Sequence, residues 1–487
     1  MARLLGIDVG TTGVRAGIFD EQGTLLAEAS EACPHATPAV GRAEADAEAW
    51  WTAVCGACAR VGEREPLGRV DGVAVTGQAP TAVLVDGAAR ALRPAILWLD
   101  VRADAEARAL DATLGPGRAE ALGGNRMHAY YLGPKLAWLR AHEPEVFDRT
   151  AFVVQSHAFI ALRLTGEAAC DPSTAMLCSP LFDAAAGQWS DEAARAVGVP
   201  ARMLPRVVRA HDVLGSVTRE AADATGLRQG TPVVAGGGDF AASALGAGVV
   251  EEGRACLMLG TAGNLLMPMN ARRFDSRLIN SHHVGCDRWL ALGGTLCGAA
   301  LEWFRRVFAP GEPWETLEAE AQSVAPADGL IALPYLQGER TPVWDEGARG
   351  CFFGLELAQG RGQLYRAMLE GIALGFRDCM AVAEEHGVGF AEVVAANGAG
   401  RSALLRQTLA DALGVPVTWS SQGGGTLAGA AILAGLGTGV LELGGVGAWG
   451  ARSPVRHEPE PRAHARLRSV FARRKALHDA VRAVERG

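Results

Sequence analysis

The chain opens with the segment RLLGIDVGTTGVRAGIFD, which covers residues 3–20. Two apolar runs, 3–9 and 14–19, flank the turn Gly10-Thr11-Thr12-Gly13. Apolar runs of this length that are separated by a glycine-containing turn are typical of a β-hairpin. We therefore expect a hairpin here that opens the fold.

Outward from this hairpin, helical and strand-like patterns alternate along the chain. An Ala- and Trp-rich helix is predicted near 43–60, strands at Val70–Thr76 and Thr81–Val85, and a further helix near 101–114. Alternation of this kind predicts an α/β fold rather than an all-α or all-β one.

A second start follows after residue 250. The apolar run Cys256–Leu259 leads into Gly260-Thr261-Ala262-Gly263 and then into Asn264–Met267, which is again strand, Gly-Thr-Gly turn and strand. The same device used twice predicts one domain per half. We therefore expect an N-terminal domain over 1–247, a C-terminal domain over 248–450, and a linker with a C-terminal helix over 451–487.

The totals exclude several classes of protein. A length of 487 residues suits two large domains. The net charge of −8 argues against a nucleic-acid partner, which would require a basic surface. No apolar run approaches the ~20 residues of a membrane span, and the first residues do not resemble a signal peptide. We therefore expect a cytoplasmic protein without a membrane partner.

Phosphate binding by lysine is excluded by composition. The only lysines are Lys135 and Lys475, and the loop GxxxxGK[ST] is absent. A bound phosphate would therefore depend on backbone N–H groups of glycine-rich turns. Asp8 ends the first strand beside such a turn, where its carboxylate could position a hydrated Mg²⁺. The alternative is a plain hairpin in which Asp8 satisfies turn amides.

A second acidic residue follows three glycines in the segment VVAGGGD, residues 233–239. The glycines leave room for a substrate beside the Asp239 carboxylate. A hydroxyl is a poor nucleophile, so a carboxylate that takes its proton is the expected general base. The alternative is that Asp239 only caps the helix predicted from Phe240 onward.

A third glycine-rich segment, VVAANGAGR, covers residues 393–401. Gly/Ala backbone there could form a flat surface for adenine or ribose, and 423–426 could form the opposite wall. The spacing Gly398-x-Gly400-x-x-Ala403 also matches a loose dinucleotide fingerprint, which leaves an NAD-dependent enzyme as a weak alternative.

The longest informative block begins with LPYLQGERTP at 333–342, continues through Phe353-Gly354-Leu355, and ends with Ala367-Met368-Leu369-Glu370-Gly371. Together with the segments GIDVGTTG, VVAGGGD and LGTAG, this ordered set resembles the FGGY family of carbohydrate kinases, and within it most closely the xylulose-phosphorylating members. The resemblance covers roughly residues 3–440.

This resemblance implies two actin-like (RNase H-like) α/β domains that flank a deep catalytic cleft, with ATP and Mg²⁺ as cofactors and a small-molecule sugar as substrate. It implies that Asp239 is the catalytic base and that Asp8 and Asp239 lie at the metal. The implied nucleotide-binding residues are Gly10, Thr11, Thr12, Gly13, Gly260, Thr261, Ala262, Gly263, Gly398, Ala399 and Ser402. The implied sugar-binding residues are Gln78, Ala79, Pro80, Asp100, Arg102, Asp239 and Phe240.

The sugar-binding segment departs from the family pattern in two places. Xylulose kinases usually carry Gln-Met-His where this chain has Gln78-Ala79-Pro80, and Asn or Gln often follows the base where this chain has Phe240. Loss of polar contacts changes which hydroxyl groups a pocket accepts. A different ketose or a polyol therefore stays open as the substrate, as does a catalytically silent sensor. Asp100 and Arg102 could equally form an ordinary ion pair, and a homodimer is compatible with the family.

Overall fold

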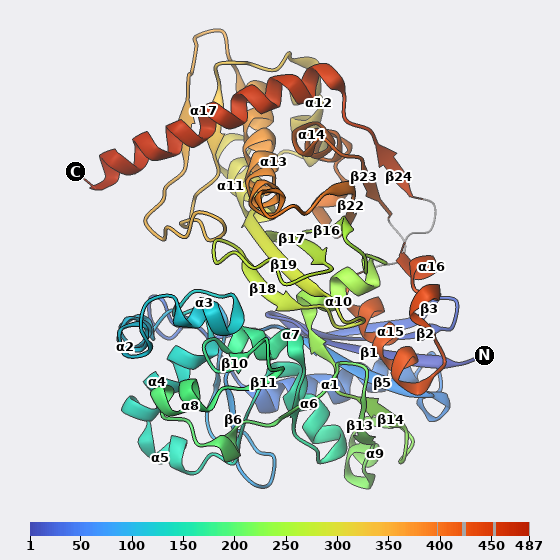
Figure 1. The fold of residues 1–487 in the computed structure, drawn as a ribbon. Helices are drawn as coiled ribbons and strands as arrows, with labels where there is room; N and C mark the ends of the chain where they lie inside the picture. The colour runs from blue at the N-terminus through green and yellow to red at the C-terminus, as the bar shows by residue number, and fades with distance from the viewer. Residues whose placement is uncertain (397, 421–424, 451–453, 487) are drawn as a thin grey trace. The chain divides into compact units, whose positions relative to one another are not determined.

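The computed structural model describes residues 1–396, 398–420, 425–450 and 454–486. The chain forms two compact units (Figure 1). Unit 1 contains Met1–Val250, Asn280–Leu290 and the described part of 423–452, and unit 2 contains Glu251–Ile279, Ala291–Gln422 and the described part of 453–487. None of the described helices is both long and apolar enough to cross a bilayer.

Unit 1 is built on one mixed sheet with strand order β13-β14-β5-β1-β2-β3, and β15 is also paired to β5. β1 and β2 form the expected antiparallel hairpin, and β5 runs parallel to β1. The strands of unit 1 are β1 (Arg3–Val9), β2 (Gly13–Asp20), β3 (Leu25–Ala32), β4 (Glu44–Ala45), β5 (Gly72–Gly77), β6 (Val83–Val85), β7 (Ala95–Ile96), β8 (Phe152–Val154), β9 (Ala169–Cys170), β10 (Phe182–Asp183), β11 (Gln188–Trp189), β12 (Arg206–Val207), β13 (Val213–Ser216), β14 (Pro232–Val234) and β15 (Gly237–Gly238).

Helices cover this sheet with apolar stripes. In α1, Trp50, Val54, Cys58 and Val61 recur at helical spacing and are fully buried against the sheet. The helices of unit 1 are α1 (Ala47–Gly62), α2 (Asp104–Leu114), α3 (Arg118–Gly123), α4 (Leu132–His142), α5 (Pro144–Asp148), α6 (Ser156–Thr165), α7 (Pro172–Ala175), α8 (Asp191–Val197), α9 (Arg219–Thr225), α10 (Asp239–Gly246), α15 (Thr426–Thr438) and α16 (Gly447–Gly450).

Helix α15 joins unit 1 although it lies far along the chain. It packs on β1 and β5 and crosses α10. A Cβ atom at Gly429 would come within 1.9 Å of the Ala242 carbonyl oxygen, so the crossing requires glycine. The predicted domains were contiguous segments with 423–450 in the second one. The structure differs because the small-residue face of α15 fits the backbone of unit 1 so closely.

Unit 2 repeats the strand plan of unit 1. β16 and β17 form an antiparallel hairpin, β22 runs parallel to β16, and the order is β19-β17-β16-β22-β23-β24. The strands are β16 (Gly253–Leu259), β17 (Ala262–Met269), β19 (Trp289–Leu296), β20 (Ile331–Leu333), β21 (Cys351–Phe353), β22 (Phe390–Ala396), β23 (Val417–Trp419) and β24 (Val455–His457), and β18 (Ile279–His282) stands where the chain passes from unit 2 to unit 1. The hairpins predicted at 3–19 and 256–267 are both present, at equivalent places in the two sheets.

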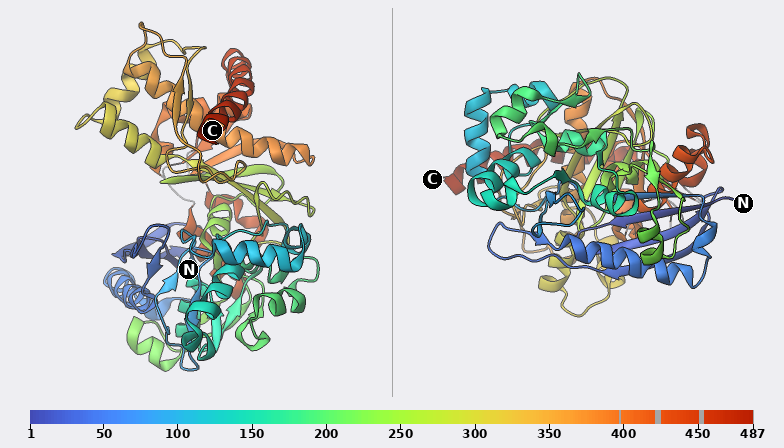
Figure 2. Two further views of the ribbon diagram at one scale, coloured as in Figure 1. Left: turned by 90° about the vertical axis from the view of Figure 1, so that its left-hand side faces the viewer. Right: turned by 90° about the horizontal axis from the view of Figure 1, so that it is seen from below.

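The helices of unit 2 are α11 (Gly298–Phe308), α12 (Trp314–Ser323), α13 (Arg361–Glu385), α14 (Ala403–Leu413) and α17 (Pro461–Arg486). α17 ends the chain and packs on α13, α14 and β20 (Figure 2). Its Leu467 and Val470 are buried, while Arg462, Arg468 and Arg473 face solvent. The predicted C-terminal helix is therefore present and docked through its apolar positions.

Candidate functional site

The end of β1 places Asp8 in the interior of unit 1. Its carboxylate receives the Arg15 guanidinium at 2.7 Å on Oδ2 and lies 3.5 Å from the Thr76 hydroxyl on Oδ1. Burial raises the pKa of Asp8 above its ordinary value, although Arg15 and Thr76 act in the opposite direction. Asp8 is therefore an acid held in a low-dielectric site with one oxygen only weakly engaged.

Asp239 begins α10, directly after β15. β15 pairs with β5 so that Gly237 stands opposite Thr76, the residue that Asp8 faces from the other side of β5. With neighbouring strands about 4.8 Å apart, the Cα atoms of Asp8 and Gly237 lie about 10 Å from each other. The two acids also interact electrostatically. Unit 1 thus brings both sequence-predicted carboxylates into one site.

The protonation of Asp239 reflects this setting. Burial, and secondarily the negative charge of Asp8, raise the pKa of Asp239 to about 7. The carboxylate accepts a hydrogen bond from the backbone N–H of Phe240 at 2.7 Å. A general base is most effective when its pKa lies near the working pH. Asp239 therefore has the protonation behaviour of a general base at neutral pH.

The glycines before Asp239 are required by the backbone. Gly236 has φ +76°, and a Cβ atom there would lie 1.9 Å from the Val75 carbonyl oxygen. Only glycine tolerates both the left-handed conformation and this approach. The VVAGGGD segment therefore lets β15 lie directly against β5 and brings the acid into the site.

The first glycine turn follows Asp8. The N–H of Gly10 donates to the Gly13 carbonyl at 2.9 Å, which closes the turn. The Thr11 hydroxyl accepts a long hydrogen bond, 3.4 Å, from the Trp98 indole, and Thr12 is exposed. The four predicted phosphate-contact residues of this half thus form one tight turn beside the acid pair.

The predicted sugar-binding segment continues from β5. Gln78 is 1% exposed; its Nε2 donates to the Gly10 carbonyl at 3.3 Å, and its Oε1 has no hydrogen-bond partner among the described residues. Ala79 and Pro80, which follow Gln78 in the chain, are buried, and so is Phe240, which follows Asp239. An unsatisfied buried acceptor is costly and indicates a position where a ligand hydroxyl could donate.

Asp100 and Arg102 are engaged with each other. The Asp100 carboxylate is fully buried, accepts the backbone N–H of Ala43 at 2.7 Å, and receives Nε and Nη2 of Arg102 at 2.9 and 2.7 Å. Arg102 also pairs with Glu44 at 2.7 Å. The ion-pair alternative describes these contacts, so a role of either residue in sugar binding stays a prediction.

Lys135 holds the backbone of the loop that precedes Asp100. It is fully buried, and its Nζ donates to the backbone carbonyls of Leu97 and Tyr130 at 2.8 and 2.9 Å. Burial lowers the pKa of Lys135 to about 7. One of the two lysines is thus used to hold loop backbone rather than phosphate, as expected for a chain without a phosphate-binding lysine motif.

Unit 2 contains a separate cavity of about 730 Å³. Gly260, Thr261, Gly398 and Ala399, four of the residues predicted to contact a nucleotide, line it. The remaining lining residues are Leu259, Leu296, Gly298, Ala299, Glu302, Trp303, Arg306, Leu336 and Gln337. The cavity is large enough for a nucleotide, since pockets for such ligands have volumes of about 300–1,000 Å³.

Three of the nucleotide-binding residues predicted in unit 2 lie outside this lining. Ala262 and Gly263 begin β17, and a Cβ at Gly263 would collide with the Phe376 ring at 2.3 Å, so this glycine serves packing. Ser402 caps α14 by accepting the N–H of Leu405. Trp303 also borders the cavity. Asn397 and the segment 421–424, which includes part of the predicted opposite wall, lie outside the described residues.

Sequence reasoning missed Arg15. Its contact with Asp8 could have been found from the hairpin register, because the GTTG turn places Arg15 directly across from Asp8. Arg15 also interacts electrostatically with Asp239. It is therefore the cation of the acid site. No group of three or more His, Cys, Asp or Glu side chains within the described ranges could hold a metal by itself.

Comparison with protein families gives two matches that together span most of the chain. Residues 3–246 match the N-terminal domain model of the FGGY family of carbohydrate kinases, and residues 256–438 match its C-terminal domain model. The two matched segments contain, respectively, the acid site and the cavity of unit 2.

Individual relatives of the chain are also carbohydrate kinases. The chain is 35% identical to the xylulose kinase of Escherichia coli (strain K12) over 88% of this chain and 89% of that one, and 31% identical to the xylulose kinase of Bacillus subtilis over 91% and 89%. Among solved structures, the xylulose kinase of Rhodospirillum rubrum has a TM-score of 0.92 at 32% identity, covering both chains fully.

Proposed function

The chain belongs to the FGGY family of carbohydrate kinases, and we propose that it phosphorylates the ketose xylulose. It is an ATP-dependent sugar kinase, because the family models match over most of its length. The relatives named above supply the identity of the acceptor. The observation that carries the mechanism is the acid site of unit 1, where a partly protonated Asp239 stands near Asp8.

In the proposed reaction Asp239 takes the proton of the acceptor hydroxyl while the oxygen of that hydroxyl attacks the γ-phosphorus of ATP. The bond from that phosphorus to the β–γ bridging oxygen breaks, ADP leaves, and the proton remains on Asp239. A pKa of about 7 lets the carboxylate accept this proton at neutral pH and release it afterwards. The N–H of Phe240 holds the carboxylate in place during this step.

The other predicted residues divide the remaining tasks. The glycine turn at 10–13 offers backbone N–H groups to the terminal phosphates, and Arg15 places a positive charge beside them. The unpartnered Oε1 of Gln78 accepts a sugar hydroxyl. Gly260, Thr261, Gly398 and Ala399 form the wall against which the adenosine lies.

Asp8 and Asp239 are suited to Mg²⁺. Magnesium prefers oxygen ligands and accepts few from the protein. Burial raises the pKa of both acids, and the negative charge of Asp8 raises that of Asp239 further, which is the electrostatic situation that a divalent cation relieves. When bound, Mg²⁺ would offset the negative charge of the triphosphate. Arg15 forms an ion pair with Asp8 and not with Asp239 among the described residues, so it leaves the charge of the two acids incompletely balanced.

The test is sugar-dependent release of ADP measured across ketoses, aldoses and polyols. We expect the highest kcat/KM with D-xylulose and formation of D-xylulose 5-phosphate. Asp239→Asn should lower kcat by ~10²–10⁴ with a smaller effect on sugar affinity. A better acceptor than xylulose would refute the substrate assignment, and near-normal turnover of Asp239→Asn would refute the base.

A further inference from the structure

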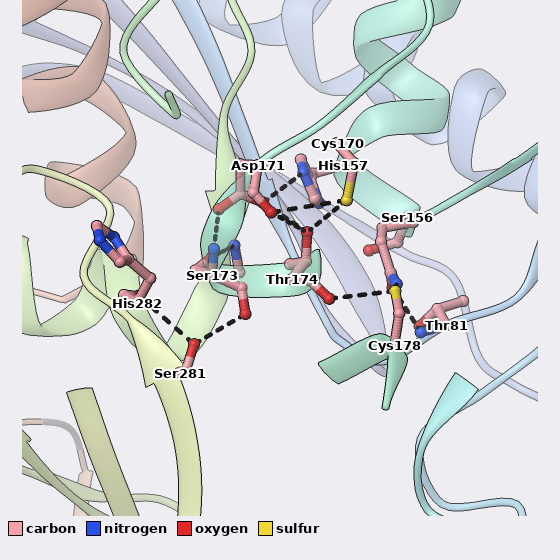
Figure 3. A network of polar contacts seen from close by, with 12 residues as sticks. Thr81, Ser156, His157, Cys170, Asp171, Ser173, Thr174, Cys178, Ser281 and His282 are labelled. Atoms are coloured by element: carbon pink, nitrogen blue, oxygen red, sulfur yellow. Dashed lines mark hydrogen bonds and ion pairs between the residues drawn. The ribbon is translucent and has the colours of Figure 1, made fainter. Parts of the chain in front are cut away.

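The strand that carries the catalytic base is held on two sides. On one side, β15 pairs with β5. On the other, the N–H of Gly238, the residue before Asp239, donates to the Ser173 hydroxyl at 3.1 Å. Ser173 is 1% exposed, and its own carbonyl receives the Ser281 hydroxyl at 2.8 Å (Figure 3). Ser173 therefore offers a fixed acceptor to the backbone of the base segment.

Asp171 orients Ser173 and also reaches the strand. Its Oδ2 accepts the N–H of Ser173 at 2.8 Å, and its Oδ1 accepts the Thr174 hydroxyl at 2.5 Å. A Cβ at Gly237 would lie 3.0 Å from Asp171 Oδ2, so this carboxylate lies directly against the strand. Two contacts from the start of α7 thus define where β15 lies.

His157 completes the chain of contacts. Its Nε2 lies 3.4 Å from Asp171 Oδ1, and both side chains are 1% exposed (Figure 3). Its Nδ1 is buried and has no hydrogen-bond partner in the described part of the chain. The preceding Ser156 donates to the Gln78 carbonyl at 2.8 Å. His157 therefore lies between the segment after β5, which contains Gln78, and Asp171, which contacts β15.

The charge state of this network is defined. Burial alone would raise the pKa of Asp171, but His157, Ser173 and Thr174 hold it below its ordinary value. Asp171 is thus an ionised carboxylate far from solvent. A buried charge is expensive and is tolerated only with well-placed partners, so each partner has little freedom to move.

We propose that His157, Asp171 and Ser173 form a positioning relay that sets the place of the catalytic base Asp239 through the backbone of Gly238. None of the three is a catalytic residue, because each acts through the base-bearing strand. The proposal rests on Asp239 being the base. A displacement of about 1 Å in a reacting group costs about 100-fold in rate, so loss of the Ser173 contact should reduce turnover before it reduces binding.

The first experiment compares Ser173→Ala with Ser173→Thr. The alanine variant loses the acceptor for Gly238, and we expect kcat to fall by about 10- to 100-fold with KM for sugar and ATP within about threefold. The threonine variant keeps the hydroxyl and should recover most of the rate. Ser190→Ala is the matched control, because Ser190 caps α8 through the same Oγ contact without touching the base strand; its kcat should be unchanged.

A purely stabilising role makes a different prediction. In that case Ser173→Ala would lower the melting temperature while the folded fraction turned over at the normal rate, and this result would overturn the proposal. Asp171→Asn provides the second variant, since it keeps one acceptor oxygen but removes the charge that faces His157. Asp171→Asn should lower kcat. Adding Ser173→Thr to this variant should not restore the rate.

A double-mutant cycle separates failure of the proposal from failure of the base assignment. If Ser173 acts through Asp239, Ser173→Ala should have little further effect in the Asp239→Asn background. Independent, multiplicative losses would contradict the relay while leaving the base in place. Near-normal activity of Asp239→Asn alone would instead remove the base assignment on which the relay rests.

Discussion

Asp239 destabilises the ligand-free protein whenever its carboxylate is charged. Its pKa is about 7 in the folded chain, against an ordinary value of 3.8, because of burial and then Asp8. The folded state therefore binds a proton that the unfolded state has released, and stability falls as the pH rises from about 4 to about 7. Above pH 7 the full penalty is present.

Asp239→Asn should therefore stabilise the ligand-free protein while it abolishes most of the activity. We expect a gain on the order of 2 kcal/mol at pH 8, shrinking steadily toward pH 5. The measurement is the melting temperature across this range without nucleotide or sugar. Asp148→Asn, at an exposed position at the end of α5, is the control and should have an effect of less than about 0.5 kcal/mol at each pH. A gain independent of pH would contradict the assignment.

At the residue scale, local pattern predicted the acids but not their partners. Asp8 could be found because it ends an apolar run beside a glycine turn, and Asp239 because three glycines precede it. The Asp8–Arg15 contact was also within reach, since hairpin register places the two residues opposite each other. Asp171 and Ser173 gave no such signal, because they meet β15 only through the tertiary fold.

At the element scale, α17 adds one deeply buried cation to the apolar contacts that hold it on unit 2. Arg474 is 2% exposed, donates to the Tyr335 hydroxyl at 2.7 Å, and lies 3.6 Å from the Asp378 carboxylate. The neighbouring Lys475 contacts the same carboxylate at 3.0 Å, but its side chain is half exposed. The two residues thus contact the same carboxylate, but only Arg474 is buried and hydrogen-bonded to Tyr335.

Arg474→Met should destabilise the protein by about 3–5 kcal/mol, because it leaves the Asp378 carboxylate and the Tyr335 hydroxyl with fewer partners in the interior. Lys475→Met should cost less than about 1 kcal/mol, as expected for an exposed ion pair. Chemical denaturation followed by circular dichroism measures both. Equal losses in the two variants would show that α17 is held mainly by its apolar contacts.

Elements whose contacts are close in sequence were predictable, and those that depend on distant partners were less so. The hairpin β1–β2, the hairpin β16–β17 and the terminal helix α17 follow from periodicity and turn residues alone. The placement of α15 in unit 1 does not follow from them. Its glycines predict a small-residue helix, but they do not predict that α10 and β1 pack against it. For the same reason, the contiguous domains that we predicted differ from the two units of the structure.

At the scale of the whole molecule, the predicted contacts to the acceptor and to the adenosine separate by unit, while the predicted phosphate contacts occur in both. The acceptor side, with Gln78 and Asp239, belongs to unit 1, whereas the cavity that contains Gly398 and Ala399 belongs to unit 2. Substitutions in the two places should therefore affect different substrates. Such a separation is a sharper test than loss of activity, because a misfolded variant would weaken both.

Ala399→Phe should fill part of the cavity and raise KM for ATP by about 10- to 100-fold, since overpacking a wall costs about 1–3 kcal/mol. Its KM for sugar should stay within about threefold. Gln78→Met removes Oε1, which has no partner among the described residues, and the long hydrogen bond from Nε2 to Gly10, with little change in volume, so it should raise KM for sugar by about 10- to 100-fold and KM for ATP much less. Steady-state kinetics with each substrate varied at saturation of the other measure both effects, and each variant is the control for the other. If either substitution raised both constants equally, the assignment of adenosine to unit 2 and of acceptor to unit 1 would have to be abandoned.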